Sequence, residues 1–148
     1  METINSITSF KVAGEYFGVE SIKVLHILEM TTPTHVPLSK EYFLGVINNH
    51  GNMIPVVDFR MMLGAEPEAN LPEASIIIVS IDGTNETLVG FKVDEVDEVF
   101  DYNPENVSND VVLEVSKLVQ PSLRGMLQDK DKFVYLINLD VLSKELEK

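Results

Sequence analysis

Short apolar stretches alternate with turn residues roughly every ten positions along this chain of 148 residues, and few folds accommodate such spacing. The β-branched run 75–81 is followed by a turn at 82–86 and by a second apolar run at 87–93. Residues 45–49 and 53–57 are joined by His-Gly-Asn, which is typical of a β-hairpin. Many short strands with regular turns predict an all-β barrel or sandwich.

Further strands are expected at residues 6–12, 16–19, 95–102 and 132–139, whereas residues 22–30 are apolar with a mixed period. Helices are minor in this prediction: a single turn within 58–64, a short helix within 116–123 that Pro121 weakens, and a terminal helix at 141–148. Asp58 and Asn138 each precede a predicted helical turn, and both are expected to cap it.

The sequence also suggests an internal repeat. Gly18, Val24 and Ile27 recur 72 residues later as Gly90, Val96 and Val99, and the segment 45–62 resembles the segment 125–142, 80 residues later. Chance is the competing explanation, because matches between apolar residues are common. A genuine duplication predicts two similar small barrels.

Composition restricts the function. The chain has 24 acidic and 11 basic residues, a net charge of −13, which disfavours nucleic acids and anionic membranes as partners. No apolar run approaches the ~18 residues of a membrane helix, and the first five residues lack signal-peptide features. The absence of cysteine is compatible with a reducing compartment but does not establish one.

No catalytic motif is recognisable. The sequence contains no phosphate-binding loop, no Gly-x-Ser-x-Gly and no His-Glu-x-x-His. His26, His35 and His50 lack the spacing of a helical ligand pair. We therefore expect no enzymatic activity, no cofactor and no metal site.

Four segments, in order, resemble the CheW family of chemotaxis coupling proteins. The strongest is 45–60, Gly-Val-Ile-Asn-Asn-His-Gly followed by Ile-Pro-Val-Val-Asp-Phe-Arg, which is similar to the family signature. Residues 10–24 look like its opening hairpin, 90–96 like its Gly-x-x-Val-Asp-x-Val segment, and 134–142 like its closing strand and helix. No single segment is decisive, but their order and spacing cover nearly the whole chain.

The resemblance implies one domain over residues 1–148, made of two intertwined five-stranded β-barrel subdomains with short helical turns and a C-terminal helix. It implies a non-enzymatic, cytoplasmic adaptor that couples chemoreceptors to a CheA-type histidine kinase. One barrel end would bind the regulatory domain of the kinase, and a groove between the barrels would take the helical hairpin of the receptor's cytoplasmic tip.

By motif match, one set of residues would form the receptor groove. Its members are Val24, His26, Ile27, Gly45, Asn49, His50, Gly51, Val96 and Val99. For the valines, an ordinary core position explains the sequence equally well.

The chain departs from the family at the groove. His50 replaces the usual Arg, His26 replaces a common Glu, and Asn49 replaces Leu. Two interpretations are open: adaptation to a different receptor tip, or a paralogue that has lost receptor binding. If the two histidines face each other, protonation of imidazoles, with a usual pKa of about 6.5, would weaken partner binding in mild acid. A zinc site would need a third ligand.

Two functions of other kinds stay open. The chain could be an interaction module of this fold in another signalling or motility pathway, because a fold alone does not select a pathway. It could also be a small-ligand-binding barrel, which a deep pocket with convergent polar groups would favour.

Overall fold

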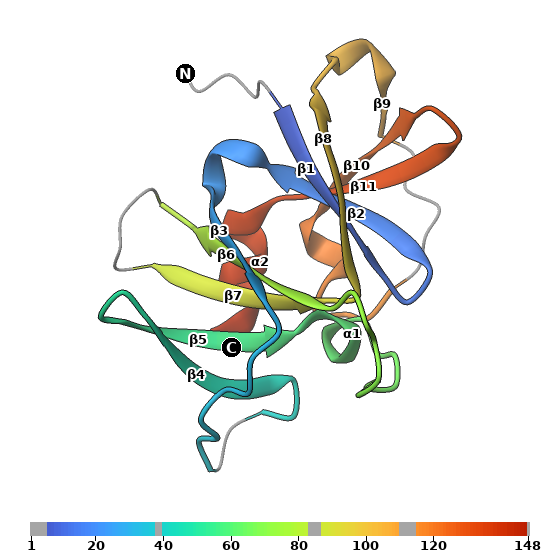
Figure 1. The fold of residues 1–148 in the computed structure, drawn as a ribbon. Helices are drawn as coiled ribbons and strands as arrows, with labels where there is room; N and C mark the ends of the chain where they lie inside the picture. The colour runs from blue at the N-terminus through green and yellow to red at the C-terminus, as the bar shows by residue number, and fades with distance from the viewer. Residues whose placement is uncertain (1–5, 38–39, 83–86, 110–114, 148) are drawn as a thin grey trace.

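The computed structural model describes residues 6–37, 40–82, 87–109 and 115–147, and these residues form two β-sheets with two short α-helices (Figure 1). The strands are β1 (Ser6–Val12), β2 (Glu15–Glu20), β3 (Val24–Glu29), β4 (Phe43–Asn49), β5 (Asn52–Asp58), β6 (Ser75–Ser80), β7 (Leu88–Val93), β8 (Glu95–Asp101), β9 (Val107–Ser108), β10 (Leu123–Asp129) and β11 (Lys132–Ile137). The helices are α1 (Phe59–Met62) and α2 (Leu139–Leu146), with 3-10 turns η1 (Ser21–Lys23), η2 (Pro104–Asn106) and η3 (Gln120–Ser122).

Sheet A has the strand order β8-β1-β2-β11-β10-β9, and sheet B has the order β3-β6-β7-β5-β4. Neighbouring strands are antiparallel except for β2 with β11 and β5 with β7, which are parallel. Each sheet therefore combines strands from the first and the second half of the chain. The intertwined, mostly β architecture predicted from the sequence is confirmed.

The strand pairing repeats at the spacings seen in the sequence. In the two parallel pairs, Leu136 lies opposite Gly18 and Val56 lies opposite Gly90. The hairpins β4–β5 and β10–β11 each contain a register shift, just before Gly45 and Gly125 respectively. Chance does not explain matched registers, so the two halves follow one structural plan.

Sheet A has six strands where five were expected, because the short β9 adds to β10. Sheet B has a smaller addition that corresponds to β9. Thr34 forms an isolated bridge with Val46 of β4 through two backbone hydrogen bonds of 2.8 and 2.9 Å. Among the described residues, no ladder joins β8 to β9 or β3 to β4. The edge strands β3 and β8 therefore keep one side unpaired within the described part of the chain.

The main core lies where the sheets meet the helices. Phe10, Phe17, Phe59 and Tyr135 pack there with ring centroids 5.2–6.1 Å apart. Asp58 caps α1 by accepting from the Arg60 amide at 2.9 Å, as the sequence predicts. Smaller cores fill each sheet separately, for example around Ile78 in sheet B.

Asn138 caps the terminal helix as predicted, but α2 starts at Leu139 rather than at 141. The predicted helix at 116–123 is wrong: a turn, closed by the hydrogen bond from the Gln120 amide to the Ser116 carbonyl oxygen at 2.9 Å, leads into η3 there. Pro121 cannot donate the backbone hydrogen bond that a longer helix would need. Of the expected turn at 82–86, only Asp82 is described, and residues 1–5 and 148 also lie outside the described part.

Candidate functional site

Four of the predicted groove residues form what we call the β3–β8 strip: Val24, Ile27, Val96 and Val99. Val24 and Val96 are half-buried against the core shared by both sheets. Ile27 and Val99, at equivalent positions of the two edge strands, are 48% and 62% exposed. A single exposed aliphatic side chain is ordinary on a protein surface, but exposure at equivalent positions of both edge strands makes these two a candidate contact surface.

A hydrogen bond links the elements next to the two edge strands, β1 and the turn η1. Thr8 of β1 lies opposite Val99, and its hydroxyl group is 2.8 Å from that of Ser21, in the turn leading into β3. Each strand also bulges beside the strip, β3 between Val24 and His26 and β8 between Val96 and Val99. Bulges interrupt regular pairing and redirect side chains.

Four other residues predicted for the receptor groove lie in a second place, which we call the histidine tip: His26, Asn49, His50 and Gly51. The rings of His26 and His50 have centroids 5.7 Å apart and an interplanar angle of 42°. His50 and Gly51 have φ of +54° and +85°, as a two-residue hairpin turn of type I′ requires. The Gly51 amide donates to the Asn48 side chain at 3.0 Å, which supports the turn.

The strip and the histidine tip occupy opposite faces of β3. Ile27 lies opposite Ile77, which belongs to the core shared by both sheets. His26 lies opposite Ile78, which belongs to the separate core of sheet B. The sequence therefore identified residues that do not share a single surface.

Gly45 belongs to neither group. It is buried, its φ is +136°, and a Cβ atom there would approach the Thr34 carbonyl oxygen to 2.1 Å. The glycine is required because the backbone of residue 34 crosses it closely.

Sequence reasoning missed a third place, the counterpart of the histidine tip in the second half. This ion-pair tip contains Asp97, Glu98, Asp129, Lys130 and Lys132. Lys132 is 2.5 Å from Asp97, and Lys130 is 3.5 Å from Glu98. A hydrogen bond with the Glu98 carboxyl group raises the pKa of Asp129, and the hydrogen bond to Asp97 raises the pKa of Lys132. The internal repeat could have revealed this tip, because it aligns His26 with Glu98 and His50 with Lys130.

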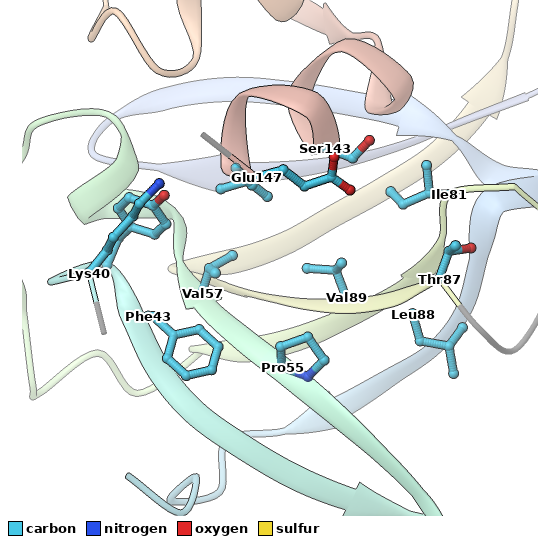
Figure 2. Close-up of a pocket in the computed structure, with 12 residues that line it drawn as sticks. Lys40, Phe43, Pro55, Val57, Ile81, Thr87, Leu88, Val89, Ser143 and Glu147 are labelled. Atoms are coloured by element: carbon cyan, nitrogen blue, oxygen red, sulfur yellow. The ribbon is translucent and has the colours of Figure 1, made fainter. Parts of the chain in front are cut away.

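Sequence reasoning also missed an apolar cavity of about 500 Å³ at one end of sheet B (Figure 2). Its walls come from β4, β5, β7 and α2, and Phe43, Val57 and Val89 point into it. The hydroxyl oxygen of Tyr42, another lining residue, is buried without a hydrogen-bond partner. Because the walls are distant in sequence, no local pattern could reveal this cavity.

An ion pair connects the segments that carry the family resemblance. Arg60 of α1 lies 2.5 Å from Asp94, which follows β7, and the same carboxylate oxygen accepts from the Ala13 amide at 2.9 Å. Three matched segments thus meet at one partly buried contact, which explains why Asp and Arg occur at these places in the pattern.

Within the described ranges, no three His, Cys, Asp or Glu side chains cluster in a way that could hold a metal ion, so the histidine pair has no third ligand there. The helices that the structure describes are also too short or too polar to cross a membrane.

Comparison with known proteins agrees with the fold and the motifs. Residues 6–147 match the CheW-like domain family. A Rhizobium etli protein named "Probable chemotaxis protein CheW" is 28% identical over 141 residues, covering 95% of this chain and 88% of that protein. The chemotaxis protein CheW of Bacillus subtilis is 28% identical over 131 residues, covering 84% of this chain and 82% of that protein.

A solved structure shows the same architecture. The scaffolding protein TtCheW from Thermoanaerobacter tengcongensis superposes with a TM-score of 0.78 at 25% identity, covering 91% of this chain and 89% of that one. With a family match over nearly the whole described length and the repeated, intertwined sheets, this chain belongs to the CheW-like domain family.

Proposed function

We propose that this protein is a non-enzymatic, cytoplasmic adaptor that couples chemoreceptors to a CheA-type histidine kinase, as one domain of two barrel-like subdomains. The support is family membership, relatives named for chemotaxis, and a structural neighbour described as a scaffolding protein. The observation that carries the proposal is the β3–β8 strip, where apolar side chains at equivalent positions of two edge strands are both exposed.

The strip suits the receptor side of the coupling. A helical hairpin presents apolar side chains at regular intervals, and such helices bind along apolar troughs. Ile27 and Val99 offer that kind of surface, and Val24 and Val96 connect it to the rigid core.

The kinase side has a separate candidate surface. The apolar cavity at the end of sheet B, lined by Phe43, Val89 and Leu146 among others, can accept apolar side chains from another barrel (Figure 2). Contacts of this kind rely on complementary apolar patches with polar rims, and Lys40 and Glu147 lie at this cavity. Two separate surfaces are what an adaptor between two partners needs.

The decisive experiment separates the two interactions. Calorimetry measures binding of the purified chain to a CheA-type regulatory domain and to the cytoplasmic tip fragment of a chemoreceptor, both from the same organism. Ile27→Glu places a charge in the strip and is expected to weaken receptor binding at least about 30-fold, a hot-spot effect, while kinase binding persists. Phe133→Glu is the matched control, because Phe133 is 50% exposed on β11, outside the strip.

The outcome distinguishes the competing functions. Binding of neither partner by the unmodified chain refutes the coupling function and favours another pathway or a small ligand in the 500 Å³ cavity, a size that suits one. Equal loss in Ile27→Glu and Phe133→Glu would show that the strip is not the receptor surface.

A further inference from the structure

The histidine tip is a preformed arrangement. The position of the His50 ring follows from its left-handed backbone, with φ of +54°, in a turn that the Asn48 side chain supports through the Gly51 amide. His26 is anchored in β3 by its pairing with Ile78. The exposed rings, 5.7 Å apart, are thus held together by the backbone of sheet B.

The tip borders an uncharged cavity of about 320 Å³. Leu28, on the same face of β3 as His26, lines it together with Asn48 and Met53 of the β4–β5 hairpin. The other lining residues are Thr31, Thr32, Thr34, Val46 and Ile47, so no lining side chain is titratable. Met53 is 62% exposed, which leaves the rim of this surface apolar.

No carboxylate of the described neighbouring elements is directed at the rings. Strands β4 and β6 contain no titratable residue, and β5 contains only Asp58, at the end far from the turn. Glu29 of β3 lies on the opposite face of the strand from His26. Lys23 of η1 donates to the Ile81 carbonyl oxygen at 3.0 Å, and Glu20, which precedes η1, faces Arg124 at 3.4 Å.

The second half of the chain shows what this position looks like when its charges are paired. Glu98 and Lys130, the counterparts of His26 and His50, lie 3.5 Å apart. Asp97 and Lys132 take the places of Leu25 and Asn52 and add a further ion pair at 2.5 Å. Of two equivalent hairpin tips, one is ionic, and the other can acquire charge near neutral pH only through its two imidazoles.

Imidazole is the side chain that ordinarily gains its charge between pH 8 and pH 5, and covering a charged group with an apolar surface is costly. The chain already carries a net charge of −13, so an acidic partner is disfavoured. An apolar helix face without carboxylates fits both conditions, with one side chain seated in the 320 Å³ cavity.

We propose that the histidine tip and the cavity beside it form a second receptor contact, on the face of β3 opposite the strip. This contact docks such a non-acidic, apolar helix face with both imidazoles neutral, so that docking releases protons and weakens in mild acid. This inference rests on the proposed function, and it adds the chemistry of the partner and a proton-dependent control. Each imidazole that must lose a proton on docking lowers affinity up to about tenfold per pH unit in the acidic range.

The test is calorimetric titration of the protein with the receptor tip fragment at pH 7.5, 6.5 and 5.5, in two buffers of different ionisation enthalpy. We expect net proton release at pH 6.5 and at least about tenfold weaker binding at pH 5.5 than at pH 7.5. The double variant His26→Gln, His50→Asn should bind with a flatter profile, because Asn tolerates the left-handed backbone at position 50. His35→Asn is the matched control and should keep the dependence of the unmodified protein.

Each result decides the matter. A flat profile or proton uptake by the unmodified protein overturns the inference but leaves the adaptor function intact, and stronger binding in acid would show that the partner brings a carboxylate. An unchanged pH dependence in the double variant also overturns it. If that variant does not bind, the proton count of the unmodified protein decides. Failure of the unmodified protein to bind at any pH refutes the proposed function together with the inference.

Discussion

Replacing Gly45 by alanine tests whether this position serves backbone packing or partner contact. The added Cβ atom would lie 2.1 Å from the Thr34 carbonyl oxygen, so the segment containing Thr34 must move. That movement breaks the two backbone hydrogen bonds between Thr34 and Val46, each contributing about 0.5–1.5 kcal/mol. A φ of +136° adds strain of about 1–3 kcal/mol for any L residue.

We therefore expect Gly45→Ala to lower the free energy of unfolding by about 3–5 kcal/mol, a large share of the usual 5–15 kcal/mol. Gly51→Ala is the control, because its Cβ atom would meet nothing within 4 Å and only its φ of +85° causes strain, about 1–2 kcal/mol. Gly125→Ala should fall between them, since its nearest contact would be the Val107 side chain at 2.9 Å.

Urea denaturation followed by circular dichroism measures all three variants, with the slope of the transition checked for two-state behaviour. Equal losses in Gly45→Ala and Gly51→Ala would refute the argument, because the crossing backbone would then impose no constraint. A Gly45→Ala protein of normal stability that fails to bind the receptor fragment would instead return Gly45 to the partner surface.

Three further predictions concern the core, the motif ion pair and the ion-pair tip. Phe59→Ala should destabilise by about 3–5 kcal/mol in urea, because this fully buried ring contacts three other aromatic rings; a loss below about 1 kcal/mol would contradict the packing. Arg60→Ala should cost about 1.5–3 kcal/mol, because the partly buried Asp94 loses its cationic partner and is left with the hydrogen bond from the Ala13 amide. Arg124→Ala, from a more exposed pair, should cost less than about 1 kcal/mol in the same assay. Asp129→Asn should stabilise the protein at pH 7. The gain in stability should shrink as the pH falls through the raised pKa of Asp129, because the unmodified protein then acquires the proton that its hydrogen bond with Glu98 favours. Urea denaturation at pH 7 and pH 4 checks the sign, and a variant that is less stable than the unmodified protein at pH 7 would contradict the reasoning.

Sequence reasoning worked where the structure is set locally. The His50–Gly51 turn follows from residues next to each other, because glycine permits the left-handed backbone that a two-residue hairpin needs. Asp58 caps α1 through an amide two residues away. The repeat was also detectable, since equivalent strands keep apolar residues at equivalent places.

It failed where distant segments decide. The helix expected at 116–123 did not form, because local propensity there is weak and Pro121 removes a donor. The cavity of Figure 2 has walls from four elements separated by most of the chain. The split of the predicted groove between two faces of β3 depends on which neighbours in β6 lie opposite Ile27 and His26.

The sequence by itself determined the strands, the hairpin turns, the helix caps, the family and the duplicated plan, because each depends on residues close together in the chain or on a pattern repeated along it. Only the tertiary structure decided which strands of each half enter which sheet. It also decided that the approach of Thr34 requires a glycine at position 45, that His26 contacts His50, and that Glu98 pairs with Lys130. His26 and His50 lie 24 residues apart in the sequence, and Glu98 and Lys130 lie 32 residues apart. Each of these contacts joins an edge strand to the turn of a hairpin with which it forms no ladder among the described residues.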